Sequence, residues 1–327
     1  MAAQLLESLQ RPEEPRSLTD EDSRKTYRYL RIGVIGAVVV LGVSIFIEWS
    51  NVDFDCYQHS ISAYYYTPVR AIFIGTMIVV GVALIVYKGR SPWEDTFLNF
   101  AGMLAPVVAI APTTDVGTCW SVRPIPLPVR ANGTLARWVH ANIDNNFYTL
   151  LIAGALGLVL SFFLVIAVNW KPGTSLIEGV QAPVKKVDKE TWISLVATAM
   201  VLVAGWGLIV NWGAFYTQAH GWAAVIFFVF LGLALVINAR AHWEKQRTLF
   251  WVYIAIAAGM LGGFIVIPLL RVGGEHTVFW LEAWQILMFA TYWIWQTVEN
   301  WDEEIEPSDA HASSGSLRAA RITNEPE

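Results

Sequence analysis

The chain has 327 residues, of which 55% are hydrophobic and only 15% are charged, and its mean hydropathy is +0.46. The charged fraction lies well below the roughly 25% of soluble domains, so the composition argues against a water-soluble globular protein. The formal charge of −5 comes largely from the tails, and the absence of a basic patch with interleaved aromatic residues excludes nucleic acid as an expected partner. The composition predicts an integral membrane protein whose partner is the lipid bilayer.

Residues 1–29 are polar and of mixed charge, and we expect them to form a loose cytoplasmic tail. A cleaved signal peptide fits this segment poorly, because the charged region is too long and no small-residue cleavage site follows. Residues 30–298 form the predicted transmembrane bundle. Residues 299–327 are acidic and then rich in Ser, Ala and Gly, which predicts a disordered cytoplasmic tail.

Eight apolar runs follow one another within residues 30–298, and most approach the about 20 residues that a helix needs to cross the hydrocarbon core. They are Ile32–Ile47, Val69–Tyr87, Phe97–Ala111, Phe147–Val168, Trp192–Val210, Gly221–Ile237, Leu249–Leu270 and Val278–Thr297. The third run is the shortest and contains Pro106, so it is either a kinked span or a re-entrant segment, and the charge pattern favours a span. We therefore predict an all-α, polytopic transmembrane helix bundle with about eight spans.

The distribution of lysine sets the predicted orientation. With a cytoplasmic N-terminus, the inner loops carry Lys88, Lys171, Lys185, Lys186, Lys189 and Lys245, whereas the outer loops contain no lysine. This positive-inside bias places both termini in the cytoplasm and the protein in the cell (inner) membrane. Residues 113–146 then form the largest outer loop, which alternating prolines make extended and stiff.

The only two cysteines, Cys56 and Cys119, both fall on the predicted outer side. Two thiols that face an oxidising compartment are expected to pair, so we predict a disulfide between them. The alternative is that the two are unrelated small residues. The bond would tie the first outer loop to the proline-rich loop.

Four of the six histidines also precede inward-running spans on the outer side, and Asp144 lies near one of them. These candidate metal ligands are His59, His140, Asp144, His220 and His276. Neutral imidazole is a common zinc ligand, and helix ends that converge on one leaflet can assemble a site from distant positions. No HExxH, HxxxH or CxxC spacing occurs. The alternative is therefore that each histidine is an interfacial hydrogen-bonding residue.

Glu282 lies inside the eighth span, where a carboxylate is costly unless it is paired, protonated or facing a wet cavity. It is either a general base or proton carrier, or one half of a structural ion pair with Arg70, at a similar depth in the second span. Ser60 is a candidate nucleophile, although such a hydroxyl more often caps a helix. The three tyrosines Tyr64–Tyr66 are expected in an aromatic belt with a specific packing role.

The segment His59–Thr67, followed by Arg70 and Gly75, resembles a group of uncharacterised bacterial multi-span membrane proteins. Val278–Ala283, with the later Trp293, resembles the last span of the same group. The resemblance covers the second and third spans and the last three, and it implies a shared membrane core but no established activity.

More distantly, the serines and histidines near the span ends are similar to those of the alkaline ceramidase and adiponectin receptor superfamily. Its members are intramembrane zinc amidohydrolases with a seven-span core and a late HxxxH ligand pair. This chain has eight predicted spans and no HxxxH.

Two function classes follow from these features. The first is a multi-pass membrane protein with a structural, binding or small-solute role and a polar cluster at the outer leaflet. The second is a metal-assisted intramembrane hydrolase acting on a lipid or amide, with zinc as the candidate metal and Glu282 and Ser60 as catalytic residues. A third, proton-coupled transport, needs a continuous polar path, which few charges inside the spans support. The sequence leaves open whether the protein is an enzyme, and it identifies no protein partner.

Overall fold

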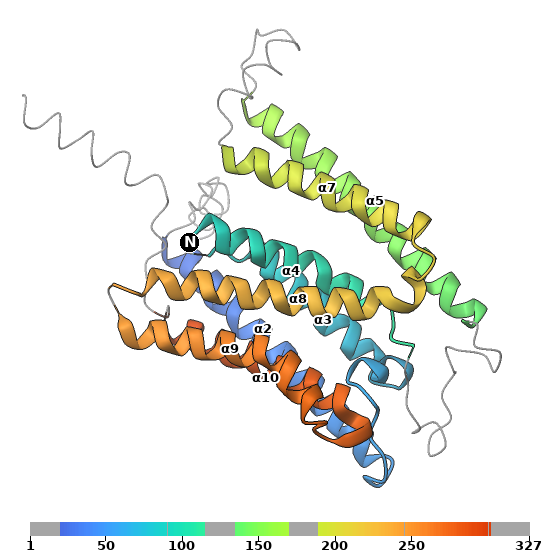
Figure 1. The fold of residues 1–327 in the computed structure, drawn as a ribbon. Helices are drawn as coiled ribbons and strands as arrows, with labels where there is room; N and C mark the ends of the chain where they lie inside the picture. Colours follow the sequence, from blue (N-terminus) through green and yellow to red (C-terminus); the bar gives the residue numbers. More distant parts are fainter. Residues whose placement is uncertain are drawn as a thin grey trace, which may run out of the picture. The chain divides into compact units, whose positions relative to one another are not determined.

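A computed structural model describes residues 20–89, 91–114, 135–169, 189–244, 246–299 and 301. These residues contain eight α-helices and two short 3₁₀ helices, and no β-strand (Figure 1). The α-helices are α2 (Asp20–Ser50), α3 (Arg70–Val86), α4 (Pro92–Ile110), α5 (Arg137–Asn169), α7 (Lys189–Asn211), α8 (Phe215–Ala241), α9 (Arg247–Leu269) and α10 (Thr277–Glu299). The 3₁₀ helices are η1 (Ser62–Tyr66) and η3 (Gly274–His276). The all-α prediction is confirmed.

Each of the eight predicted apolar runs corresponds to one of these helices, but several helices begin earlier than the run. α2 begins at Asp20, inside the predicted tail 1–29, and α5 begins at Arg137, inside the predicted loop 113–146. The reason is that an apolar run marks only the hydrocarbon-depth part of a helix, while polar turns continue the same helix beyond it. α4 continues without interruption through Pro106. That it crosses the membrane stays a prediction.

Four helical stretches are long and apolar enough to cross a membrane. They are Lys25–Ser50, Arg137–Val165, Phe215–Ala241 and Arg247–Leu269, and Arg70–Val86 and Leu195–Asn211 are shorter apolar helices. Only 6% of the most apolar part of α5 is buried within the protein. Soluble proteins rarely expose continuous apolar surfaces of this kind, so the helices indicate a membrane-embedded protein.

The chain divides into two compact units. The first consists of residues 1–33 and 294–327, and within it Arg28 Nε donates a hydrogen bond to the Trp301 carbonyl oxygen at 2.8 Å. The second, residues 34–293, contains every candidate site residue that the structure describes. In this second unit α8 packs against α4 and α9, α4 also packs against α3, and α5 pairs with α7 (Figure 1).

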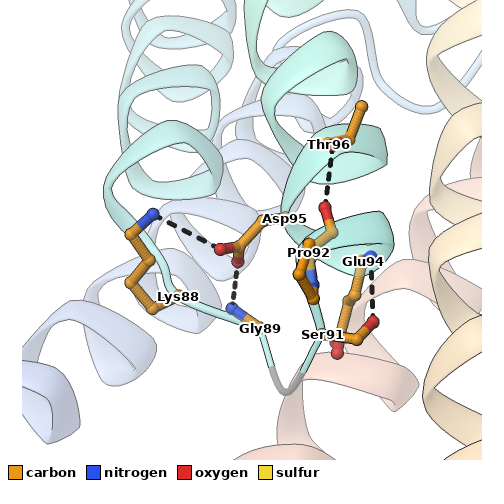
Figure 2. A network of polar contacts seen from close by, with 7 residues as sticks. All are labelled: Lys88, Gly89, Ser91, Pro92, Glu94, Asp95 and Thr96. Carbon is orange, nitrogen blue, oxygen red and sulfur yellow. Dashed lines mark hydrogen bonds and ion pairs between the residues drawn. The ribbon is translucent and has the colours of Figure 1, made fainter. Parts of the chain in front are cut away.

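A network of polar contacts fixes the turn between α3 and α4 (Figure 2). Ser91 is the N-cap of α4, and its hydroxyl accepts a hydrogen bond from the Glu94 backbone N–H at 3.2 Å. Asp95 accepts hydrogen bonds from the Gly89 backbone N–H and from Lys88 Nζ, the latter at 3.3 Å. The two acidic residues lie in the first turn of α4, where the helix dipole favours them. This capping explains why α4 begins at Pro92 rather than at the predicted Phe97.

Glycines allow some of these helices to approach closely. A Cβ atom built on Gly81 of α3 would lie 2.8 Å from the Gly102 carbonyl oxygen of α4, and one built on Gly102 would lie 2.7 Å from the Gly81 oxygen. Cβ atoms built on Gly154, Gly259 and Gly263 would also lie 2.7, 3.0 and 2.7 Å from a side chain of a neighbouring helix. The neighbouring Gly75, Gly157 and Gly262 have open space at that position.

We predict that Gly81→Ala lowers the stability of the protein by about 1–3 kcal/mol, the usual range for overpacking. The added methyl group would meet a backbone oxygen, which cannot move without separating α3 from α4. Gly75→Ala on the same helix is the matched control, because nothing lies within 4 Å of its Cβ position. Thermal unfolding of both variants in detergent measures the difference, and equal stability of the two would contradict the proposed contact.

Candidate functional site

The segment Tyr57–Thr67 lies in the connection between α2 and α3 and contains η1. The Ser60 hydroxyl accepts a hydrogen bond from the Ala63 N–H at 3.0 Å, at the first turn of η1. At the other end, the Thr67 hydroxyl donates to the Tyr64 carbonyl oxygen at 2.8 Å and accepts from the Val69 N–H at 3.2 Å. The two hydroxyl groups thus satisfy backbone groups at both ends of η1, as the capping interpretation predicted.

The three tyrosines of η1 are buried rather than arranged in a belt. They form one hydrophobic cluster with residues that include Leu41, Phe73 and Val108. Burial raises the pKa of Tyr64 to about 12 and also raises the pKa values of Tyr65 and Tyr66, so all three remain protonated at neutral pH. The Tyr66 hydroxyl therefore donates a hydrogen bond, to the Thr113 carbonyl oxygen at 2.7 Å. The predicted packing role is confirmed, but the belt is wrong.

Glu282 binds this segment directly. One carboxylate oxygen accepts from the Ser62 backbone N–H at 3.0 Å, and the other accepts from the Ser62 hydroxyl at 2.8 Å. One turn earlier in α10, the Phe279 N–H donates to the His59 carbonyl oxygen at 3.0 Å. The start of α10 is therefore joined to the segment Tyr57–Thr67 through three hydrogen bonds, two to Ser62 of η1 and one to His59 before it.

The predicted ion pair between Arg70 and Glu282 does not form. Arg70 lies on an exposed face of α3, and its guanidinium donates to the Tyr65 hydroxyl at 2.6 Å and stacks over the Tyr65 ring at 4.3 Å. Glu282 is half-buried and is held by Ser62 instead. The Arg70 guanidinium is hydrogen-bonded to Tyr65, and the Glu282 carboxylate is hydrogen-bonded to Ser62. Neither charged group therefore requires the other as a partner.

The four outer-side histidines gather at one end of the bundle, as predicted, but they make separate contacts. The rings of His59 and His276 lie 5.6 Å apart, while His140 packs against Tyr216 at 4.3 Å. Tyr216 in turn donates a hydrogen bond to Asp144 at 2.7 Å. His220 is buried, and its Nδ1 contacts the Ala111 and Val108 carbonyl oxygens at 2.7 and 3.0 Å.

The predicted metal site is therefore not assembled from these residues. Within the described ranges, no three histidine, cysteine, aspartate or glutamate side chains are arranged so that they could hold a metal ion. The five predicted ligands fall into three places, namely His59 with His276, His140 with Asp144, and His220 alone. Helix ends that share a leaflet can still point their side chains in different directions around each axis, which explains the error.

Cys56 is disulfide-bonded. Cys119 lies outside the described residues, so the predicted pairing of Cys56 with Cys119 stays a prediction. The same applies to most of the proline-rich loop, since residues 115–134 are not described.

A cavity of about 430 Å³ opens between α8, α9 and α10, beside Ser60 of the segment that precedes η1. Its polar lining includes both predicted catalytic residues, Glu282 and Ser60, together with His220 and Gln285. Its apolar lining comes mainly from Trp222, Phe228, Phe264 and Leu281. No hydrogen bond joins Ser60 to Glu282, although a nucleophile and its base need one. Ser60 and Glu282 therefore do not form a catalytic pair, and both line a cavity that could bind a small molecule.

Two side chains of the cavity wall have a polar atom without a hydrogen-bond partner. His220 is 7% exposed and Gln285 is 1% exposed, and His220 Nε2 and Gln285 Oε1 are both buried and unpartnered. The other polar atom of each side chain has a partner. His220 Nδ1 contacts the Ala111 and Val108 carbonyl oxygens, and Gln285 Nε2 donates to the Met260 carbonyl oxygen at 2.8 Å. A buried polar atom without a partner is costly, so these two atoms mark the cavity as a place where a guest can contribute hydrogen bonds.

A second buried polar cluster, at the opposite end of α8, was not predicted. Glu94 of α4 is fully buried and accepts a hydrogen bond from Asn238 Nδ2 at 2.9 Å and one from the Tyr292 hydroxyl at 3.4 Å. The sequence signal for it is Ser91-Pro92-Trp93-Glu94, which matches the capping-box pattern and places Glu94 inside a helix. The hydrogen bonds between Ser62 and Glu282 were also not predicted from the sequence.

No protein-family model, curated protein or solved structure matches this chain. The two resemblances described from the sequence therefore stay predictions.

We predict that Glu282→Ala and Ser62→Ala are coupled in a double-mutant cycle. Because the two side chains share a hydrogen bond, the loss of stability in the double variant should be smaller than the sum of the single losses by about 0.5–3 kcal/mol. The matched cycle of Glu282→Ala with Arg70→Ala should be additive within about 0.5 kcal/mol. Chemical or thermal unfolding measures both cycles, and coupling in the second cycle alone would restore the original ion-pair assignment.

We further predict that Cys56 and Cys119 form one intramolecular disulfide. Alkylation of the unfolded, unreduced protein should modify neither cysteine, and alkylation after reduction should modify both, because a disulfide sulfur does not react as a thiolate. Mass spectrometry of the intact protein counts the added groups. Peptide mapping without reduction then identifies the linked pair, and a dimer joined through Cys56 would contradict the prediction.

Proposed function

We propose that this chain is a multi-pass integral membrane protein of the cell (inner) membrane that binds a small molecule in the cavity beside Glu282. Both termini lie in the cytoplasm in this proposal, and the cavity opens near the outer leaflet. The observation that carries the proposal is the pair of unpartnered polar atoms, on His220 and Gln285, in the wall of a largely apolar cavity.

The long apolar helices and the distribution of lysine support the membrane orientation. Lys88 lies at the α3–α4 turn, at the end of the bundle that also contains Asn238 and Glu94. His59, His140, His220, His276 and the cavity lie at the other end. This separation of lysine from the cavity end is what an outer-facing binding site requires.

Binding is favoured over transport by the composition of α8. Between His220 at the cavity and Asn238 at the opposite polar cluster, every described buried position of this helix is apolar or glycine. The same holds in α10 between Gln285 and Tyr292, where the buried residue is Phe289. A continuous polar path for a proton or ion is therefore not provided by either helix.

The experiment uses Gly221, which lines the cavity and has open space at its Cβ position. We predict that Gly221→Phe fills the cavity without disturbing the fold and abolishes the stabilisation of the protein by bound small molecules. A bound compound at 100 times its Kd should stabilise the wild-type protein by about 2.7 kcal/mol. A thermal-unfolding screen of small molecules on the purified protein measures this effect.

Gly207→Phe is the matched control, because Gly207 of α7 also has open space at its Cβ position and does not line this cavity. Compounds that stabilise the wild type and the Gly207→Phe variant, but not the Gly221→Phe variant, support the proposal. If every stabilising compound acts equally on all three proteins, the cavity is not a binding site.

A further inference from the structure

We infer that the guest of the cavity is a primary ammonium compound with an apolar substituent. This inference names the ligand class and rests on the binding function proposed above. It is argued from the hydrogen-bonding capacity, the charge and the shape of the cavity wall.

The buried polar atoms that the cavity wall leaves without a hydrogen-bond partner are acceptors. His220 Nδ1 lies against two carbonyl oxygens, and because carbonyl oxygens only accept, this nitrogen carries the proton. In the neutral imidazole, the unpartnered Nε2 is then an acceptor. Gln285 uses its amide N–H on the Met260 carbonyl oxygen, so its unpartnered Oε1 is a second acceptor. The Glu282 carboxylate also lines the cavity, and it has lone pairs beyond those that accept from Ser62, so it is a third acceptor.

The charge of the cavity wall favours a positively charged guest. Neither lysine nor arginine lines the cavity, and Arg70, the predicted partner of Glu282, donates a hydrogen bond to Tyr65. In the described part of the chain, Glu282 has hydrogen bonds from Ser62 but no ion-pair partner. A carboxylate in an apolar helix favours a counter-charge, and a cationic guest supplies one.

A primary ammonium group combines the two requirements. It carries one positive charge and three N–H donors and accepts no hydrogen bonds, as in the side chain of lysine. Its three donors match in number the three acceptor groups of the wall. An alcohol brings one donor and no charge, and a quaternary ammonium brings charge without a donor.

The rest of the lining selects an apolar substituent. Trp222, Val225, Phe228, Phe264, Val278 and Leu281 surround the polar groups. A volume of about 430 Å³ accepts a phenyl or short alkyl group beside the ammonium. Burial of such a group provides affinity that does not depend on Glu282.

The test compares three probes that share one apolar group: 2-phenylethylammonium, its N,N,N-trimethyl derivative and 2-phenylethanol. Binding is measured by calorimetry or ligand-observed NMR on the full-length protein in lipid nanodiscs, with Gly221→Phe nanodiscs as the blank. We expect 2-phenylethylammonium to bind at least about tenfold more tightly than either other probe, because its hydrogen bonds are made to a charged acceptor.

Glu282→Gln is the diagnostic variant, since glutamine keeps an acceptor for Ser62 and removes the charge. It should reduce the preference for 2-phenylethylammonium over 2-phenylethanol to within about threefold, while the affinity for 2-phenylethanol changes little. Retained binding of the alcohol shows that the variant is folded, so a loss of structure cannot imitate the expected result.

Three outcomes overturn the inference. The trimethyl derivative binding as tightly as the primary ammonium would remove the need for donors. The alcohol binding as tightly would remove the need for charge. In both cases the signal is still lost in Gly221→Phe, so the proposed binding function survives. If 2-phenylethylammonium fails to bind at all, the inference falls, and the thermal-unfolding screen decides separately whether the cavity binds any small molecule.

Discussion

A carboxylate within an apolar helix must receive its hydrogen bonds from other parts of the protein, because lipid offers none. Glu282 receives two from Ser62, one from the backbone and one from the hydroxyl. To present both donors, the chain before α3 folds into the 3₁₀ turn η1, and this turn buries the tyrosines that pack against α3 and α4. The position of one acidic residue thus explains the conformation of a segment more than two hundred residues away.

The opposite end of the bundle follows the same rule with different residues. Glu94 is fully buried, and Asn238 and Tyr292 donate to it, which joins α4, α8 and α10. Between the two carboxylates, glycines bring backbones together, as where Gly81 meets Gly102, and single hydrogen bonds join neighbouring helices, as from Thr76 to the Ala37 carbonyl oxygen. Helix association in lipid gains little from the hydrophobic effect, so buried hydrogen bonds at the ends and close backbone contact in the middle hold these helices together.

The sequence predicted each of the eight described α-helices, because apolar runs and lysine-bearing loops respond to depth in the membrane, which is a one-dimensional property. It also predicted that the four histidines share one end. It failed at Arg70 and Glu282, because equal depth says nothing about the direction of a side chain around its helix axis. The true partners were a local tyrosine, five residues before Arg70, and a backbone N–H, which has no signature in the sequence. The cavity itself depends on the packing of three helices and could not be predicted.

The hydrogen bonds between Ser62 and Glu282 also have a consequence for biosynthesis. The two residues are separated by 220 positions, so the ribosome completes the first long before it reaches the second. At translation speeds of about 5–20 residues per second, η1 waits roughly 10–45 s for its acceptor. During this interval the emerging protein has seven of the eight described α-helices, and the end of the bundle that contains η1 is incomplete. The last helix therefore acts as the closing step of assembly, and a nascent chain that stops before α10 lacks the contact that fixes its first loop.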